Sequence, residues 1–159
     1  MRFPENFKVV PVLNDGDLNA GANLDTDSIN MKNFHRATFI IGLQTVDTAD
    51  VTLYAYSGAD ATTLTSALTF HYAFGSAAQG TALCDVLGAD ATSAALLIAN
   101  ATYDNYMLIV EVDAADMDIA NSESWLALRF VCGAATGNVQ IHAILEPRYT
   151  GNVSGTALA

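Results

Sequence analysis

The sequence predicts an all-β fold, a single-domain β-sandwich or jelly roll of about eight antiparallel strands. Two patterns support this prediction. Apolar and polar residues alternate along several short segments, as in strands that bury one face. Turn-forming residues separate these segments, for example at residues 57–60 and 88–90. The chain has 159 residues, of which 52% are hydrophobic and 14% charged, so it has enough apolar material for one buried core.

Alternation is clearest in four of the predicted strands. In the first of them, Ala37, Phe39 and Ile41 share one face. With two further strands and two weaker candidates, the predicted set covers residues 37–43, 51–56, 67–74, 82–86, 94–99, 106–112, 125–132 and 139–146. Residues 90–101 are rich in Ala and Leu, so a short helix is an alternative there.

Apolar side chains also occur on the strand faces opposite the predicted core. They are Ile40, Tyr54, Tyr56, Met107, Ile109, Trp125 and Ile144. Exposed apolar patches of this size normally mark interfaces, so these mixed faces favour a protomer that buries surface in an oligomer. The alternative is that the assignment of faces is shifted by one residue, in which case these side chains form the core.

The chain divides into three predicted parts. Residues 1–30 form an N-terminal arm, because an apolar beginning leads into a turn-rich stretch, and residues 31–149 form the β-sandwich or jelly-roll domain. Residues 150–159 lack charge and pattern, which predicts a flexible C-terminal tail that is mobile or lies over a neighbour. The beginning does not match a signal peptide, and the apolar runs are too short to span a bilayer. We therefore expect synthesis in the cytoplasm and no membrane partner.

The charge of the chain argues against nucleic acid as a partner. Its net charge is −11, with 17 acidic residues against six basic ones, so its surface should repel phosphate backbones. Four of the basic residues, Arg2, Lys8, Lys32 and Arg36, fall within the first 36 residues. Either this segment docks on an acidic partner, which includes a second copy of the chain, or the charges are simply scattered.

Residues typical of catalytic or cofactor sites form no recognisable motif. Cys84 and Cys132 lie in apolar segments without metal-like spacing, which favours buried free thiols over a disulfide. His35, His71 and His142 lie on different segments, as expected for structural or surface histidines. No nucleophile elbow, phosphate loop or zinc-protease motif is present. We expect no enzymatic activity, no cofactor and no metal.

One acidic segment leaves a calcium site conceivable. Its carboxylates, Asp15, Asp17, Asp25 and Asp27, supply oxygens at alternating spacing. The segment departs from the EF-hand pattern, because Ala20 stands where glycine is required and Thr26 stands where the bidentate glutamate belongs. Solvated turns are therefore the favoured interpretation.

Three segments show a family resemblance: residues 27–39 (DSINMKNFHRATF), 104–118 (DNYMLIVEVDAADMD) and 145–149 (LEPRY). They resemble small proteins encoded with the structural genes of tailed bacteriophages, which decorate or cement the capsid lattice. The resemblance spans about residues 25–149. It implies a β-sandwich or jelly-roll homotrimer on the outer surface of the capsid, with the major capsid protein as its partner. It also implies location in the virion after synthesis in the host cytoplasm.

On this interpretation, the N-terminal arm contacts the capsid or a neighbouring protomer. Three arms on one trimer would bind at high effective concentration. The expected contact residues are the apolar anchors Phe3, Phe7, Val9, Val10 and Val12, with Arg2 and Lys8 steering them. An equal alternative is that the arm completes its own domain as an edge strand.

Two other functions compete with capsid decoration. A carbohydrate- or receptor-binding β-sandwich module on a virion surface should expose a platform of aromatic residues. However, Trp125 is the only tryptophan, and the tyrosines are dispersed along the chain. An enzyme on a jelly roll would need clustered histidine and carboxylate ligands, which the sequence does not show. The favoured function is therefore a capsid decoration protein.

Overall fold

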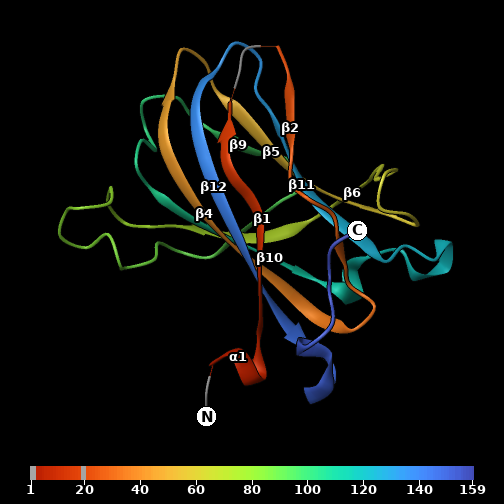
Figure 1. Cartoon of the computed structure of the whole chain (residues 1–159). Helices are drawn as coiled ribbons and strands as arrows, with labels where there is room; N and C mark the ends of the chain where they lie inside the picture. Colours follow the sequence, from red (N-terminus) through yellow and green to blue (C-terminus); the bar gives the residue numbers. More distant parts are fainter. Residues whose placement is uncertain (1–2, 19–20) are drawn as a thin grey trace.

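Two antiparallel sheets of six strands each pack face to face in the computed structural model, which confirms the predicted all-β sandwich (Figure 1). The structure describes residues 3–18 and 21–159, and only the backbone of Ile119, Thr150 and Asn152. The described strands outnumber the eight expected because several have only two or three residues. Such short strands are below the length at which alternation can be recognised.

Sheet A contains the longest strands of the sandwich. Its order is β1 (Lys8–Asp17), β12 (Thr136–Pro147), β4 (Phe34–Asp47), β10 (Met107–Asp113), β7 (Phe70–Phe74) and β8 (Ala91–Ser93). Sheet B has the order β2 (Asn23–Asp25), β11 (Trp125–Val131), β5 (Val51–Gly58) and β6 (Ser66–Leu68), while β3 (Ile29–Asn30) pairs with β11 and β9 (Leu96–Ile98) pairs with β5. The short helices are α1 (Phe3–Asn6), η1 (Ala114–Asp116), η2 (Ile119–Asn121) and η3 (Thr150–Val153).

The core lies between the two sheets. It is lined by the residues that alternation placed on the inner faces of the strands. Phe39 and Ile41 on β4 have no exposed surface, and the same is true of Val110 on β10 and Leu128 on β11. Ile40, between the two core residues of β4, lies on the outer face and is half-buried. The predicted assignment of inner and outer strand faces is therefore confirmed. The alternative assignment, in which every face is shifted by one residue, is excluded.

Two details of the strand prediction are wrong, and so is the helical alternative. Residues 67–74 are not one strand, because the chain crosses from sheet B to sheet A at Thr69, between β6 and β7. Residues 82–86 form turns instead of a strand. Residues 90–101 contain the short strands β8 and β9 and no helix, so a strand within 94–99 is confirmed and the helical alternative is wrong. For residues 67–74 and 90–101, pairing with distant strands decides the local structure, which periodicity within the segment cannot reveal.

The sandwich begins before residue 31. Strand β1 pairs antiparallel with β12, from Lys8 opposite Leu145 to Asp17 opposite Asn138. The boundary at residue 30 is therefore corrected, since β1, β2 and β3 all belong to the two sheets. The alternative of an edge strand describes β1, because it lies at the end of sheet A and pairs with β12 through a ladder that two irregularities interrupt, one between Pro11 and Leu13 and one between Leu13 and Gly16.

The C-terminal residues pack against their own domain, which corrects the prediction of a flexible tail. Ala157 is buried, and its carbonyl accepts a hydrogen bond of 2.8 Å from the backbone nitrogen of Asn30. Leu158 forms a bridge with Ile29. Lys8 Nζ also donates to the Val153 carbonyl at 3.3 Å. These contacts are formed by residues distant in sequence, so the uncharged composition of the tail gives no sign of them.

Deletion of residues 154–159 should lower the free energy of unfolding by about 1–3 kcal/mol. The physical reason is the loss of the hydrogen bond to Asn30 and of the apolar burial of Ala157. Urea denaturation measures the change. Deletion of the exposed Ala159 alone is the matched control and should have no measurable effect. An unchanged urea midpoint after the longer deletion would contradict the packed tail.

The two cysteines are free, and they differ in exposure. Cys132 is completely buried, as predicted, whereas Cys84 is only partly buried. Removal from water disfavours the thiolate and raises the pKa of the Cys132 thiol. In the folded protein, we therefore expect iodoacetamide to alkylate Cys84 and to spare Cys132 until the chain unfolds, as measured by peptide mass spectrometry. Alkylation of both thiols at equal rates in the native state would contradict this burial.

In the described part of the chain, no helix has the length and apolar character needed to cross a membrane.

Candidate interaction surface

The outer face of sheet A places apolar side chains next to one another at its centre. Ile40 on β4 lies opposite Ile109 on β10, and the neighbouring position on β12 is His142. One row further along, Ile144 on β12 lies opposite Val9 on β1. The chain covers none of these five side chains completely. We call the outward side chains of β1, β12, β4 and β10 the sheet A face.

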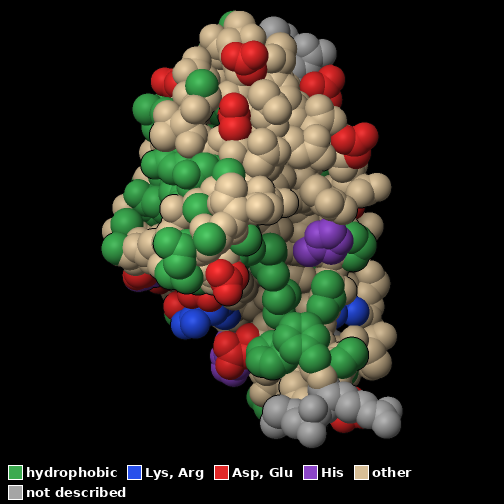
Figure 2. All heavy atoms as spheres, turned by 90° about the vertical axis from the view of Figure 1, so that its left-hand side faces the viewer, with side chains coloured by type: hydrophobic (Ala, Val, Ile, Leu, Met, Phe, Trp, Pro, Cys, Tyr) green, Lys and Arg blue, Asp and Glu red, His purple; other side chains and the backbone are tan. Residues whose placement is uncertain are grey.

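The sheet A face continues onto a long loop between β7 and β8. Residues 75–90 project away from the sandwich (Figure 1) and present Leu83, Val86 and Leu87, which are 63%, 46% and 46% exposed. Figure 2 views the molecule from the side on which this loop projects and shows hydrophobic side chains gathered across it, with acidic side chains scattered around them. Exposed apolar side chains in such numbers are typical of an interaction surface.

Backbone hydrogen bonds hold the base of this loop against the sheet. Gly75 N donates to the Met107 carbonyl, and Gly88 N donates to the Phe74 carbonyl, both at 2.7 Å. Gln79 N donates to the Asn105 carbonyl, also at 2.7 Å. The apolar part of the loop is thus supported at both ends. Less conformational entropy is lost when a supported loop binds a partner.

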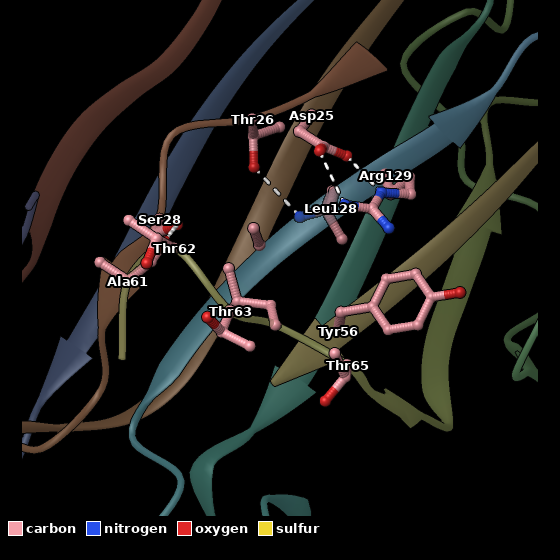
Figure 3. A pocket seen from close by; sticks show the side chains of 12 residues that line it. Asp25, Thr26, Ser28, Tyr56, Ala61, Thr62, Thr63, Thr65, Leu128 and Arg129 are labelled. Carbon is pink, nitrogen blue, oxygen red and sulfur yellow. Dashed lines mark hydrogen bonds and ion pairs between the residues drawn. The ribbon is translucent and has the colours of Figure 1, made fainter. Parts of the chain in front are cut away.

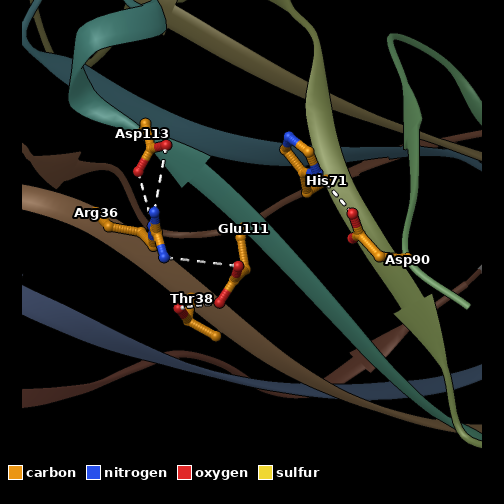
Figure 4. Close-up of polar contacts among 6 residues, drawn as sticks. All are labelled: Arg36, Thr38, His71, Asp90, Glu111 and Asp113. Carbon is orange, nitrogen blue, oxygen red and sulfur yellow. Dashed lines mark hydrogen bonds and ion pairs between the residues drawn. The ribbon is translucent and has the colours of Figure 1, made fainter. Parts of the chain in front are cut away.

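A network of polar side chains occupies one end of the sheet A face (Figure 4). Arg36 Nε donates to Asp113 Oδ1 at 2.7 Å, and Arg36 Nη1 lies 3.9 Å from Glu111 Oε2. Thr38 Oγ1 donates to the other oxygen of Glu111 at 3.0 Å. The hydrogen bond with Asp113 raises the pKa of Arg36 above its ordinary value. Because the arginine is paired in this way, it does not offer a free positive charge to phosphate.

A small hollow lies where the loop returns to the sheet. Its volume is about 210 Å³, and its lining includes Ala73, Leu87 and Ile109. At its rim, His71 Nδ1 and Asp90 Oδ2 are 3.0 Å apart (Figure 4), and both side chains are exposed. An apolar side chain of a partner would fit such a hollow, as the anchor residues of protein interfaces do.

The predicted N-terminal contact residues divide into three groups. Phe3 and Val9 are 49% and 48% exposed, and the ring of Phe3 stacks on Phe7 with centroids 5.1 Å apart. Val10 and Val12 are buried in the core, so they are not available to a partner. Lys8 is half-buried and Arg2 lies outside the described residues. Only Phe3, Phe7 and Val9 thus remain candidate apolar contacts, and Val9 belongs to the sheet A face.

The acidic residues considered above for a calcium site make separate contacts with different strands. Asp25 pairs with Arg129 on β11, with Oδ1 2.6 Å from Nε, whereas Asp15 accepts a hydrogen bond of 2.6 Å from Asn138 on β12. Among the residues that the structure describes, no group of three or more His, Cys, Asp or Glu side chains is placed to hold a metal ion.

Two surface features were not predicted from the sequence. The apolar loop residues Leu83 and Val86 lie in a segment that alternation assigned to a weak strand, although glycines around it were a sign of a long loop. The stacked pair Tyr54 and Tyr56, whose centroids are 5.7 Å apart, shows that the tyrosines are not all dispersed. Their spacing of two residues on a predicted strand was the signal that could have found them.

Comparisons with known proteins give little further guidance. No protein-family model matches the chain, and the search of curated proteins finds no match. Among solved structures, the chain is similar to the SPBc2 prophage-derived protein YomS, with a TM-score of 0.47 and 12% sequence identity. The match covers 88% of this chain and 92% of that chain. A likeness at this level assigns neither a family nor a function.

Proposed function

We propose that this protein is a non-enzymatic structural protein of a tailed-bacteriophage particle, which binds the outer surface of the capsid as a homotrimer and stabilises the shell. The main support is the sheet A face, whose centre carries the half-buried side chains of Ile40, Ile109 and Ile144, together with the exposed apolar side chains of the loop of residues 75–90. Its partners in this proposal are the major capsid protein and further copies of the chain.

The segments behind the sequence resemblance lie together in the fold, which also supports the proposal. They contribute β4, β10 and the end of β12, which are neighbours in sheet A. At one position all three meet, because Arg36 lies opposite both Asp113 and Glu146. Residues 34–39, β10 and the end of β12 are therefore neighbours in sheet A, while residues 29–30 of the first segment form β3 in sheet B.

The charges around the sheet A face indicate what kind of partner surface fits. Glu111, Asp113 and Asp90 lie at one end of the apolar centre, and the arginine among them is already paired. A partner surface with an apolar centre and basic residues at its rim would be complementary. Binding at several such places on a capsid would connect neighbouring subunits, and a trimer would strengthen it through multivalency.

Sedimentation with undecorated capsids tests the proposal directly. Purified protein should pellet with the capsids in a saturable amount, and it should stay in the supernatant when capsids are omitted. Capsids that bind it should also release their DNA at a higher temperature, as measured with a dye that fluoresces on DNA. Failure to co-sediment would refute capsid binding, and binding without a thermal shift would refute stabilisation. Native mass spectrometry of the free protein tests the trimer separately.

The N-terminal contact can be tested without disturbing the sandwich. Deletion of residues 1–6 removes α1, which has no buried side chain among its described residues, and leaves β1 intact. If Phe3 contacts the capsid, this deletion should weaken binding about tenfold, and Phe3→Ala should reproduce most of the loss. Unchanged capsid affinity in both variants would refute the N-terminal contact. A deletion as far as residue 13 is unsuitable, because it would remove Val10 and Val12 from the core.

A further inference from the structure

A pocket lies on the outer face of sheet B, on the opposite side of the sandwich from the sheet A face. It has a volume of about 390 Å³, and strands β2, β5 and β11 form its floor (Figure 3). Residues 61–65, which follow β5, cross over the floor and form a wall. This volume lies within the range of about 300–1,000 Å³ that is usual for small-ligand sites.

The wall of the pocket is held in place by its own hydrogen bonds. Asp60 Oδ1 accepts from the backbone nitrogens of Thr62 and Thr63 at 2.9 and 2.8 Å, and from Thr62 Oγ1 at 2.8 Å. These bonds, that of the Thr62 hydroxyl first, lower the pKa of Asp60 below its ordinary value. Ser28 Oγ donates to the Ala61 carbonyl at 2.7 Å. A side chain at Gly58 would overlap the Thr63 carbonyl, so only glycine permits this close approach.

Arginine and aspartate form a planar pair beside an aromatic ring in this pocket (Figure 3). Arg129 Nε donates to Asp25 Oδ1 at 2.6 Å, and Nη2 donates to Oδ2 at 2.8 Å. The guanidinium carbon of Arg129 lies 5.2 Å from the ring centroid of Tyr56. Within the described residues, no hydrogen bond uses Nη1 of Arg129, so this donor stays available next to the carboxylate acceptors.

The chemistry of the lining limits the class of ligand. An anion would find the charge of Arg129 neutralised by Asp25 and would meet a chain of net charge −11. A cation would find the Asp25 carboxylate already paired. An apolar ligand would exclude water from the Arg129–Asp25 pair and from the Thr65 hydroxyl without replacing the hydrogen bonds that water makes there. The lining therefore suits a neutral ligand with several hydroxyl groups and one apolar face.

We infer that this pocket binds a neutral sugar residue of a glycan. The C–H groups on one face of the sugar ring would pack against the Tyr56 side chain, which also lies beside Arg129 and stacks on Tyr54. Asp25 would accept hydrogen bonds from sugar hydroxyls, while Arg129 Nη1 would donate to a sugar oxygen. The inference does not depend on capsid attachment. Because the pocket and the sheet A face lie on different sheets, sugar binding and capsid binding can fail independently.

Saturation-transfer NMR with the full chain tests this inference. The probes are glucose, galactose, mannose and N-acetylglucosamine, each up to about 10 mM, a range that detects weak single-sugar affinities. At least one should receive saturation at its ring protons, and amide resonances of residues 25–28, 61–65 and 127–129 should shift with it. Transfer to none of the four sugars would overturn the inference, as would a preference for glucuronate over glucose.

Variants separate pocket binding from binding elsewhere. Tyr56→Ala should weaken the affinity for the sugar at least tenfold, and so should Asp25→Asn, which changes an exposed side chain and keeps its shape. Tyr149→Ala removes a tyrosine that is 75% exposed and lies outside the pocket, so it should bind like the wild type. Urea unfolding of each variant checks the fold. Undiminished binding by a folded Tyr56→Ala or Asp25→Asn variant would overturn the assignment of the pocket.

Discussion

Phe39→Ala should lower the free energy of unfolding by about 3–5 kcal/mol, the usual cost of truncating a buried phenylalanine. Phe39 has no exposed surface and lies on β4, between Ala143 of β12 and Val110 of β10. Removing its ring leaves a cavity that a sheet paired on both sides cannot collapse to fill. Since small domains have a total stability of about 5–15 kcal/mol, the variant should unfold at much lower urea concentration.

Tyr149→Ala is the matched control for this substitution, because it removes an aromatic ring that is 75% exposed. It should change the free energy of unfolding by no more than about 0.5 kcal/mol. Equilibrium urea denaturation followed by circular dichroism measures both variants. If Phe39→Ala costs less than about 1 kcal/mol, the inward face of β4 is assigned wrongly.

Ile40→Glu should weaken binding to undecorated capsids by about 30- to 1,000-fold, the range for loss of a central interface residue. Ile40 is the next residue on β4 after Phe39, but it points to the opposite side and lies at the centre of the sheet A face. A glutamate there would have to lose its water in the complex without a partner. Because the side chain is on the outside, stability should change by no more than about 1 kcal/mol.

Thr52→Glu is the matched control for Ile40→Glu, because it adds the same charge on β5, in the other sheet. It should bind capsids like the wild type. Quantitative co-sedimentation at constant ionic strength measures the affinity of all three proteins. Equal losses in both variants would mean that charge alone decides binding, and wild-type binding by Ile40→Glu would exclude the sheet A face.

The comparison of Phe39 with Ile40 shows what the sequence by itself determined. Side chains in a strand alternate with a period of two whatever the strand pairs with, so the pattern on β4, β10, β11 and β12 was enough to assign inner and outer faces. It also placed Ile40, Ile109 and Ile144 on the outside, where the structure has them. The main apolar residues of the sheet A face were therefore predictable.

Only the tertiary structure decided which strands are neighbours. Val10 and Val12 are core residues because β1 pairs with β12, and Ala157 is buried because the chain end packs next to Asn30. The pocket depends on Asp25 and Arg129, which are 104 positions apart, and on a wall that returns over Gly58. Pairing between distant strands has no periodic signal within either segment, since it depends on the whole packing of two sheets. Alternation can therefore predict the faces of a strand but not its partner.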